Sequence, residues 1–209
     1  MAVIVFDFDG TLADSQSVIL DIYNKSISPK WNLRPVSHAD FKELRLMSLR
    51  KGARYIGLKP YQLPAILAEG HRLILAHTGD IKLFPKIPKL IEKLAGQGHK
   101  LYVLSTNSES VIHQVLESYN VAQHVHVLKS SRLLGKATAL KKLLKDTNSK
   151  PDDMWMVGDE VRDIVAAHKA GVKSLAVTWG FQPSILLEAQ SPTAIAHNRI
   201  ELKTILLGS

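Results

Sequence analysis

Short apolar runs of strand length alternate with amphipathic stretches along most of the chain. Continuous runs of this kind are typical of strands in a parallel sheet that is covered on both faces. Between them, apolar residues recur at the spacing of a helix face. The predicted strands are 3–6, 101–104, 125–128, 154–157 and 174–177, and the predicted helices between them are 88–96, 109–119, 136–146 and 161–170.

The segment from about 14 to 81 has a different pattern, with three helical stretches and no strong strand signal. They run from Asp14 or Ser15 to Ser26, over 38–57 and over 63–77. Strands alternating with helices predict an α/β fold with a doubly wound parallel, Rossmann-like sheet. We therefore expect a core domain of residues 1–13 and 82–209, and a helical insertion of residues 14–81 after the first strand.

Composition excludes several classes of protein. The 209 residues contain no cysteine, so disulfides, thiolate nucleophiles and cysteine metal sites are ruled out. No uncharged apolar stretch approaches the roughly 18 residues of a membrane span. The first residues lack the basic region of a secretory signal. These features predict a cytoplasmic protein with no membrane partner.

The net charge of +8 favours anionic ligands. The basic residues are scattered, and no nucleic-acid motif is present, so a small phosphorylated molecule is the expected partner and no specific nucleic acid is expected. Arg45, Arg50 and Arg54 are candidates for contacting a second anionic group of such a ligand, although most of them are expected on a solvated helix face.

The first predicted strand ends in two carboxylates, Asp7 and Asp9, followed by Gly10 and Thr11. Side chains two residues apart on a strand point to the same face, so the two carboxylates are expected side by side. Such a pair indicates a metal site or acid/base chemistry, because close like charges repel unless a cation or a proton intervenes. The alternative is a solvated Asp-Gly turn.

Two other predicted strands also end in polar residues, one in Ser105-Thr106-Asn107 and one in Gly158-Asp159. In open α/β sheets, ligands bind beyond the carboxyl ends of the strands. We therefore expect these distant segments to meet at one place. This favours a functional site at Asp7 and Asp9 over a solvated Asp-Gly turn.

The residue types at these strand ends fit phosphoryl transfer. Asp7 can act as a nucleophile without deprotonation, and Asp9 can donate and accept the proton. Asp159, with Asp163 one helical turn later, can complete an oxygen-ligand set for Mg²⁺ with Asp7, and Glu160 is a weaker candidate. The candidates for binding phosphate are Thr11, Ser105, Thr106, Asn107 and Lys136.

With these motifs, the chain resembles the haloacid dehalogenase superfamily, in particular its phosphoglycolate phosphatase-like members with a small helical cap. The matching residues are the motif at 7–11, the strand leading into Ser105, Leu134-Gly135-Lys136, and 157–163 with its two aspartates. The resemblance implies a central first strand flanked by the strands that lead to Ser105 and Asp159.

The resemblance also implies roles for the residues. Asp7 would be the nucleophile and Asp9 the general acid/base, and Ser105 and Lys136 would bind the phosphoryl group. Mg²⁺ would be held by Asp7, the backbone carbonyl of Asp9, and Asp159, with Asp163 nearby. An acid at position 9 favours phosphatases over dehalogenases. A phosphomutase and a non-catalytic polyanion-binding module remain alternatives.

Overall fold

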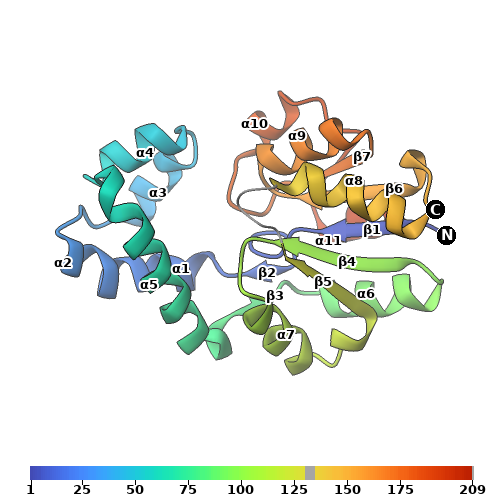
Figure 1. Cartoon of the computed structure of the whole chain (residues 1–209), viewed down its shortest axis with the longest axis horizontal. Coiled ribbons are helices and arrows are strands. Elements are labelled where there is room, and N and C mark those ends of the chain that lie inside the picture. The colour runs from blue at the N-terminus through green and yellow to red at the C-terminus, as the bar shows by residue number, and fades with distance from the viewer. Residues whose placement is uncertain (130–134, 209) are drawn as a thin grey trace.

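The computed structural model describes residues 1–129 and 135–208, without the side chains of residues 38, 49 and 129 (Figure 1). Leu134, the first residue of one predicted motif, lies outside this description. The described chain forms a six-stranded sheet with helices on both faces, and a group of helices to one side of it.

The sheet is parallel throughout, in the order β5-β4-β1-β6-β7-β8. This confirms the predicted fold class and the central place of the first strand. Phe6 pairs with Val103 on one side and with Val157 on the other, so the residues that follow these strands meet at one edge. The strands are β1 (Val3–Phe6), β4 (Lys100–Ser105), β5 (Val125–Lys129), β6 (Met154–Gly158), β7 (Lys173–Val177) and β8 (Ala194–Ala196).

Alternate residues of β1 enter two different hydrophobic cores. Ile4 and Phe6 pack with α6 (Ile87–Gly96), α7 (Glu109–Ser118) and α11 (Arg199–Leu207). Val3 and Val5 pack with α8 (Gly135–Thr147) and α9 (Val161–Ala170). The period of two in a strand explains this division, and the buried apolar side chains hold β1 in the middle of three layers.

The helical segment leaves the sheet after β1 and returns before α6. Its entry and exit strands, β2 (Ala13–Asp14) and β3 (Lys82–Leu83), pair antiparallel. It has a small core of its own around Ile22, Ile27 and Leu33. Its elements are α1 (Gln16–Ile22), the π-helix η1 (Tyr23–Ile27), α2 (Ser28–Trp31), α3 (His38–Leu44), α4 (Leu49–Tyr55), the 3₁₀ turns η2 (Pro60–Gln62) and η3 (Thr78–Asp80), and α5 (Leu63–Ala76). The division into two domains stays a prediction.

The structure differs from the predicted helices and strands in two places. The helical stretch expected over 38–57 consists of two helices, because Ser48 caps a new helix at Leu49 by accepting a hydrogen bond from the Lys51 N–H group. The end of the chain adds α10 (Ser184–Glu188), β8 and α11, which the sequence pattern did not predict. Strand β8 has only three residues, two of them alanines, so its place in the sheet comes from pairing with β7.

None of the helices in the described part of the chain is long and apolar enough to cross a membrane.

Lys86 provides a test of the backbone geometry at the start of α6. It has φ of 73°, a left-handed conformation that is unfavourable for any residue with a Cβ atom. Lys86→Gly should therefore raise the free energy of unfolding by about 0.5–1 kcal/mol, after allowance for the greater entropy of unfolded glycine. Urea denaturation measures this change.

The matched control is Lys93→Gly, the same substitution at an exposed position inside α6. There glycine should lower the free energy of unfolding by about 1 kcal/mol. The two variants are expected to shift the denaturation midpoint in opposite directions, and a loss of stability in both would contradict the argument.

Candidate active site

Asp7 begins the site at the carboxyl end of β1. Its side chain is buried, with Oδ1 accepting a hydrogen bond of 2.7 Å from the Phe8 N–H group and Oδ2 lying 2.7 Å from Lys136 Nζ. Its own N–H group donates to the Val157 carbonyl of β6, which continues the sheet one residue beyond the strand. The backbone therefore fixes where this carboxylate lies.

Lys136, in the first turn of α8, joins two acidic segments. Its Nζ lies 2.7 Å from Asp7 Oδ2 and 2.6 Å from Asp163 Oδ1, and all three side chains are buried. Burial by itself would lower the pKa of Lys136, but the carboxylates of Asp163 and Asp7 outweigh it and raise the pKa. The lysine is thus held in its charged form between two carboxylates.

Asp159 follows β6 and is fully buried. Its Oδ1 accepts a hydrogen bond of 2.7 Å from Thr11 Oγ1, and its Oδ2 accepts one of 2.7 Å from the Phe181 N–H group. Burial, together with the charges of Asp7 and Asp163, raises the pKa of Asp159 well above its ordinary value. The Thr11 hydroxyl, expected to bind phosphate, is used in this structure to orient Asp159.

Two glycines allow the backbone to approach these carboxylates. Gly10 has φ of +75°, and a Cβ atom there would lie 2.3 Å from Asp159 Oδ2. A Cβ atom on Gly158 would lie 2.3 Å from Asp163 Oδ2. Both distances are shorter than atoms tolerate, so larger residues at these positions would displace the carboxylates.

Asp9 lies beside the end of β4, as the sequence predicts. Both of its carboxylate oxygens accept from Asn107 Nδ2, at 3.1 and 3.3 Å, and the Asn107 N–H group donates to Ser105 Oγ at 3.1 Å. Ser105 is buried and Thr106 is half-buried. Burial, with the nearby charge of Asp7, raises the pKa of Asp9 to about 6 despite the hydrogen bonds that oppose the shift.

Among the described residues, the acidic group that brings three ligand oxygens together differs from the predicted metal set. Asp7, Glu160 and Asp163 have ligand oxygens within 4.8 Å of one another. The sequence predicts Asp159 as a metal ligand and Glu160 only as a weaker candidate for that role. In the structure, the carboxylate oxygens of Asp159 accept hydrogen bonds from Thr11 and Phe181. Burial, only partly offset by Lys136, raises the pKa of Asp163 to about 6.

Sequence reasoning missed Arg162 as part of this cluster. Its guanidinium pairs with Glu160, and its Nη2 lies 4.0 Å from Asp7 Oδ2. In the sequence, Arg162 stands between Glu160 and Asp163 and has the pattern of an ordinary surface arginine. Its position near Asp7 depends on the packing of α9 beside β1. The cluster then has two cations, Lys136 and Arg162, against five carboxylates, those of Asp7, Asp9, Asp159, Glu160 and Asp163. A buried acidic excess of this kind fits a bound divalent cation.

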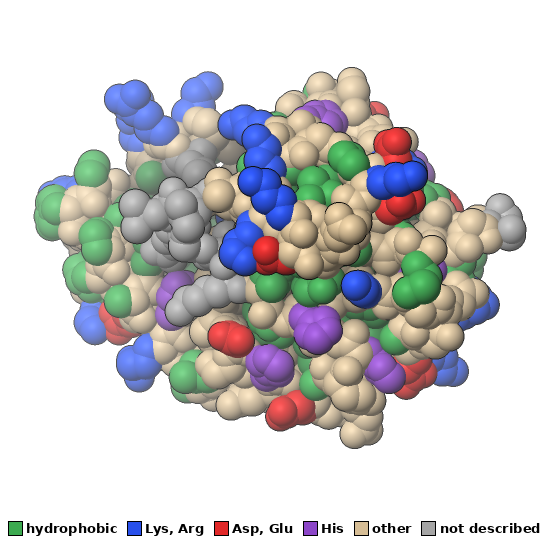
Figure 2. Space-filling view, turned by 45° about the vertical axis from the view of Figure 1, so that its right-hand side comes forward, with side chains coloured by type: hydrophobic (Ala, Val, Ile, Leu, Met, Phe, Trp, Pro, Cys, Tyr) green, Lys and Arg blue, Asp and Glu red, His purple; other side chains and the backbone are tan. Residues whose placement is uncertain are grey.

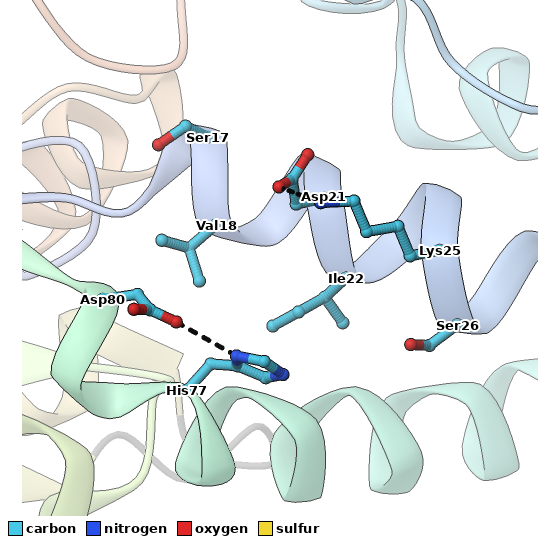
Figure 3. A pocket seen from close by; sticks show the side chains of 8 residues that line it. All are labelled: Ser17, Val18, Asp21, Ile22, Lys25, Ser26, His77 and Asp80. Carbon is cyan, nitrogen blue, oxygen red and sulfur yellow. Dashed lines mark hydrogen bonds and ion pairs between the residues drawn. The ribbon is translucent and has the colours of Figure 1, made fainter.

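A separate cavity of about 390 Å³ lies in the helical segment, lined by residues of α1 and η1 and by His77 and Asp80, which follow α5 (Figure 3). Its charged side chains pair with each other: Lys25 Nζ lies 2.7 Å from Asp21 Oδ2, and His77 Nδ1 lies 3.1 Å from Asp80 Oδ2. None of the carboxylates at the strand ends lines it. The chemistry therefore concentrates at the sheet edge.

The helical segment supplies much of the positive charge. The sequence from Arg45 to Ala68 contains five Lys and Arg residues and no acidic residue. Figure 2 shows Lys and Arg side chains gathered toward the upper left of the face it presents. Positive charge of this kind favours the approach of anionic ligands.

Comparison with known proteins places these features in a family. The model of the haloacid dehalogenase-like hydrolases matches residues 4–177. A phosphoglycolate phosphatase from Synechococcus elongatus is 33% identical over 92% of this chain and 91% of its own length. The tyrosine-protein kinase PtkA from Mycobacterium tuberculosis is 25% identical over 93% of this chain and 68% of its own length.

The fold is likewise shared with a solved structure. A haloacid dehalogenase-like family hydrolase from Streptococcus pneumoniae superimposes with a TM-score of 0.83 at 23% identity, over 98% of both chains. The family model and the relative from Synechococcus confirm the resemblance and the phosphatase class expected from the motifs. The chain belongs to the haloacid dehalogenase-like hydrolase family.

Proposed function

We propose that this protein is a Mg²⁺-dependent phosphatase that hydrolyses a small phosphate monoester through a phosphoaspartate on Asp7. The observation that carries the proposal is the buried trio of Asp7, Lys136 and Asp163, beside a second aspartate, Asp9, with a pKa near 6. This arrangement supplies a nucleophile, a cation for the phosphoryl group and an acid/base in one place.

In the first step, an Asp7 carboxylate oxygen attacks phosphorus and the bond from phosphorus to the leaving oxygen breaks. Asp9 gives its proton to that oxygen. A pKa near 6 suits a group that must be protonated in one step and ionised in the next at near-neutral pH. In the second step, Asp9 takes a proton from water, which attacks the phosphorus of phospho-Asp7 and releases phosphate.

Lys136 and the segment after β4 are proposed to bind the phosphoryl group. Lys136 already faces Asp7 and carries a firmly held charge. Ser105, Thr106 and Asn107 precede α7, where hydroxyl and backbone N–H groups can bind phosphate oxygens. For Thr11 we propose the additional role of orienting Asp159, because its hydroxyl contacts that carboxylate.

We propose that Mg²⁺ is held by Asp7, Asp159 and Asp163, with the backbone carbonyl of Asp9. Glu160 is added as an alternative ligand, because its oxygen lies near those of Asp7 and Asp163. Bound Mg²⁺ would neutralise the negative charge that otherwise separates an attacking carboxylate from a phosphate. The raised pKa values of Asp159 and Asp163 support a site in need of such a cation.

The substrate is proposed to be a small phosphorylated metabolite, and phosphoglycolate is the first to test because a 33% identical relative is a phosphoglycolate phosphatase. We propose that residues 14–81 form the cap domain that selects it. A phosphomutase would use the same aspartates, and transfer of the phosphoryl group to a second substrate hydroxyl instead of water would identify one. The cytoplasmic location stays a prediction.

Substitution of the two aspartates tests the mechanism. Asp7→Asn should lower kcat by at least about 10³-fold, because an amide oxygen is a poor nucleophile. Asp9→Asn should lower kcat by about 10²–10⁴-fold, because neither step then has a proton donor or acceptor. Phosphate release from phosphoglycolate and other small monoesters measures both effects.

The matched control is Asp14→Asn, an exposed carboxylate a few residues beyond the site. It should leave turnover close to that of the unaltered protein. If Asp7→Asn retained activity comparable to Asp14→Asn, the covalent mechanism would be rejected.

Removal of the metal provides an independent test. A chelator should abolish turnover and Mg²⁺ should restore it, and Asp163→Asn should raise the half-saturating Mg²⁺ concentration by about 10–100-fold. The exposed carboxylate of Asp152 supplies the control substitution, Asp152→Asn, which should leave that concentration unchanged. Full turnover in the chelated protein would rule out a metal requirement.

A further inference from the structure

Arg45 connects the helical segment to the loop that follows β7. It lies directly after α3, and its Nη2 donates a hydrogen bond of 3.1 Å to the Gly180 carbonyl, while its Nε donates to the Phe181 carbonyl. These partners lie 135 and 136 residues away in sequence. Arg45 is one of the three arginines that the sequence offers as candidates for contacting a substrate anion, and in this structure it contacts two backbone carbonyls instead.

The same loop contacts the active site from its other side. The Phe181 N–H group donates to Asp159 Oδ2 at 2.7 Å. Gly180 lies so close that a Cβ atom on it would be 2.3 Å from the same oxygen. The Phe181 ring lies against Phe41 of α3, with centroids 6.4 Å apart, and a Cβ atom on Gly10 would lie 2.5 Å from that ring.

One peptide group therefore joins Arg45 to Asp159. The Gly180 carbonyl that accepts from Arg45 and the Phe181 N–H group that donates to Asp159 belong to the same peptide unit. A cation on the carbonyl oxygen polarises the peptide, which makes its N–H group a stronger donor to the carboxylate. A guanidinium can also hold two neighbouring carbonyls at once, which fixes the orientation of the peptide.

We infer that Arg45 is a positioning residue that orients Asp159 through the Gly180–Phe181 peptide while the helical segment lies against the core. The role of Asp159 in holding Mg²⁺ rests on the proposed function. Arg45 contacts neither the carboxylates nor the phosphoryl-binding residues directly, and acts on the metal site only through this peptide. Docking of the helical segment and completion of the metal site thereby become one event.

The test compares Arg45→Ala and Arg45→Lys with Lys42→Ala, a control that removes an exposed cation from α3, the helix that precedes Arg45. The substrate is p-nitrophenyl phosphate, which has no second anionic group for Arg45 to bind. Arg45→Ala should raise the half-saturating Mg²⁺ concentration and lower kcat, each by about tenfold, with little change in KM. Arg45→Lys keeps the positive charge but loses the planar guanidinium that binds both carbonyls. Its half-saturating Mg²⁺ concentration and kcat should therefore lie between those of Arg45→Ala and the unaltered protein.

A second measurement does not depend on catalysis. Mg²⁺ should raise the midpoint of thermal unfolding, because it binds the folded state. The Mg²⁺ concentration needed for half of that shift should be about tenfold higher in Arg45→Ala and unchanged in Lys42→Ala. The unfolding curve without Mg²⁺ also reports whether each variant folds.

The outcomes separate this inference from the proposed function. If the unaltered protein is a Mg²⁺-dependent phosphatase but Arg45→Ala behaves like Lys42→Ala in both measurements, only the positioning role is overturned. If Arg45→Ala raises KM for phosphoglycolate alone and leaves p-nitrophenyl phosphate unaffected, Arg45 binds substrate instead. If the unaltered protein hydrolyses no phosphate monoester, the proposed function fails, and the Mg²⁺ shift in unfolding still tests the coupling.

Discussion

The whole site depends on how buried negative charge is neutralised at the carboxyl edge of the sheet. Taking a carboxylate out of water is costly unless a cation or a hydrogen-bond donor faces it. Lys136 offsets this cost for Asp7 and Asp163, with contacts of 2.7 and 2.6 Å. For Asp159, hydrogen bonds from the Thr11 hydroxyl and the Phe181 N–H group do so. Burial, together with the charge of Asp7, still raises the pKa values of Asp159 and Asp163, and a bound divalent cation would relieve this condition.

Close packing makes this arrangement rigid. Strand β1 is buried on both faces, and its alternate residues pack into two different hydrophobic cores. The position of Asp7, directly after this strand, follows from that packing. Gly10, Gly158 and Gly180 then bring the backbone nearer to Asp159 and Asp163 than any residue with a Cβ atom would allow. Since interiors are close-packed, small displacements of these loops move the carboxylates themselves.

The helical segment contributes to the active site through direct contacts as well as through its positive charge. Arg45 and Phe41 reach the loop after β7, and that loop in turn contacts Asp159 and Gly10. Residues near positions 41–45 and 159–181 thus meet around the motif at 7–11. An insertion between β1 and α6 is well placed for this, because its two connecting strands pair with each other beside that motif.

Local sequence determined much of this protein. The apolar runs predicted β1, β4, β5, β6 and β7, and the carboxyl ends of parallel strands predicted that Asp7, Asp9, Ser105 and Asp159 would lie together. These features follow from periodicity and from polar residues at strand ends, which a single chain displays. The break between α3 and α4 comes from the local cap by Ser48, whereas the short edge strand β8 and the place of Arg162 were decided by tertiary structure. The same holds for the use of Thr11 on Asp159 and for the contact of Arg45 with Gly180. Each depends on a partner far away in sequence, and the hydrogen bond or charge it satisfies exists only once the strands and helices have packed.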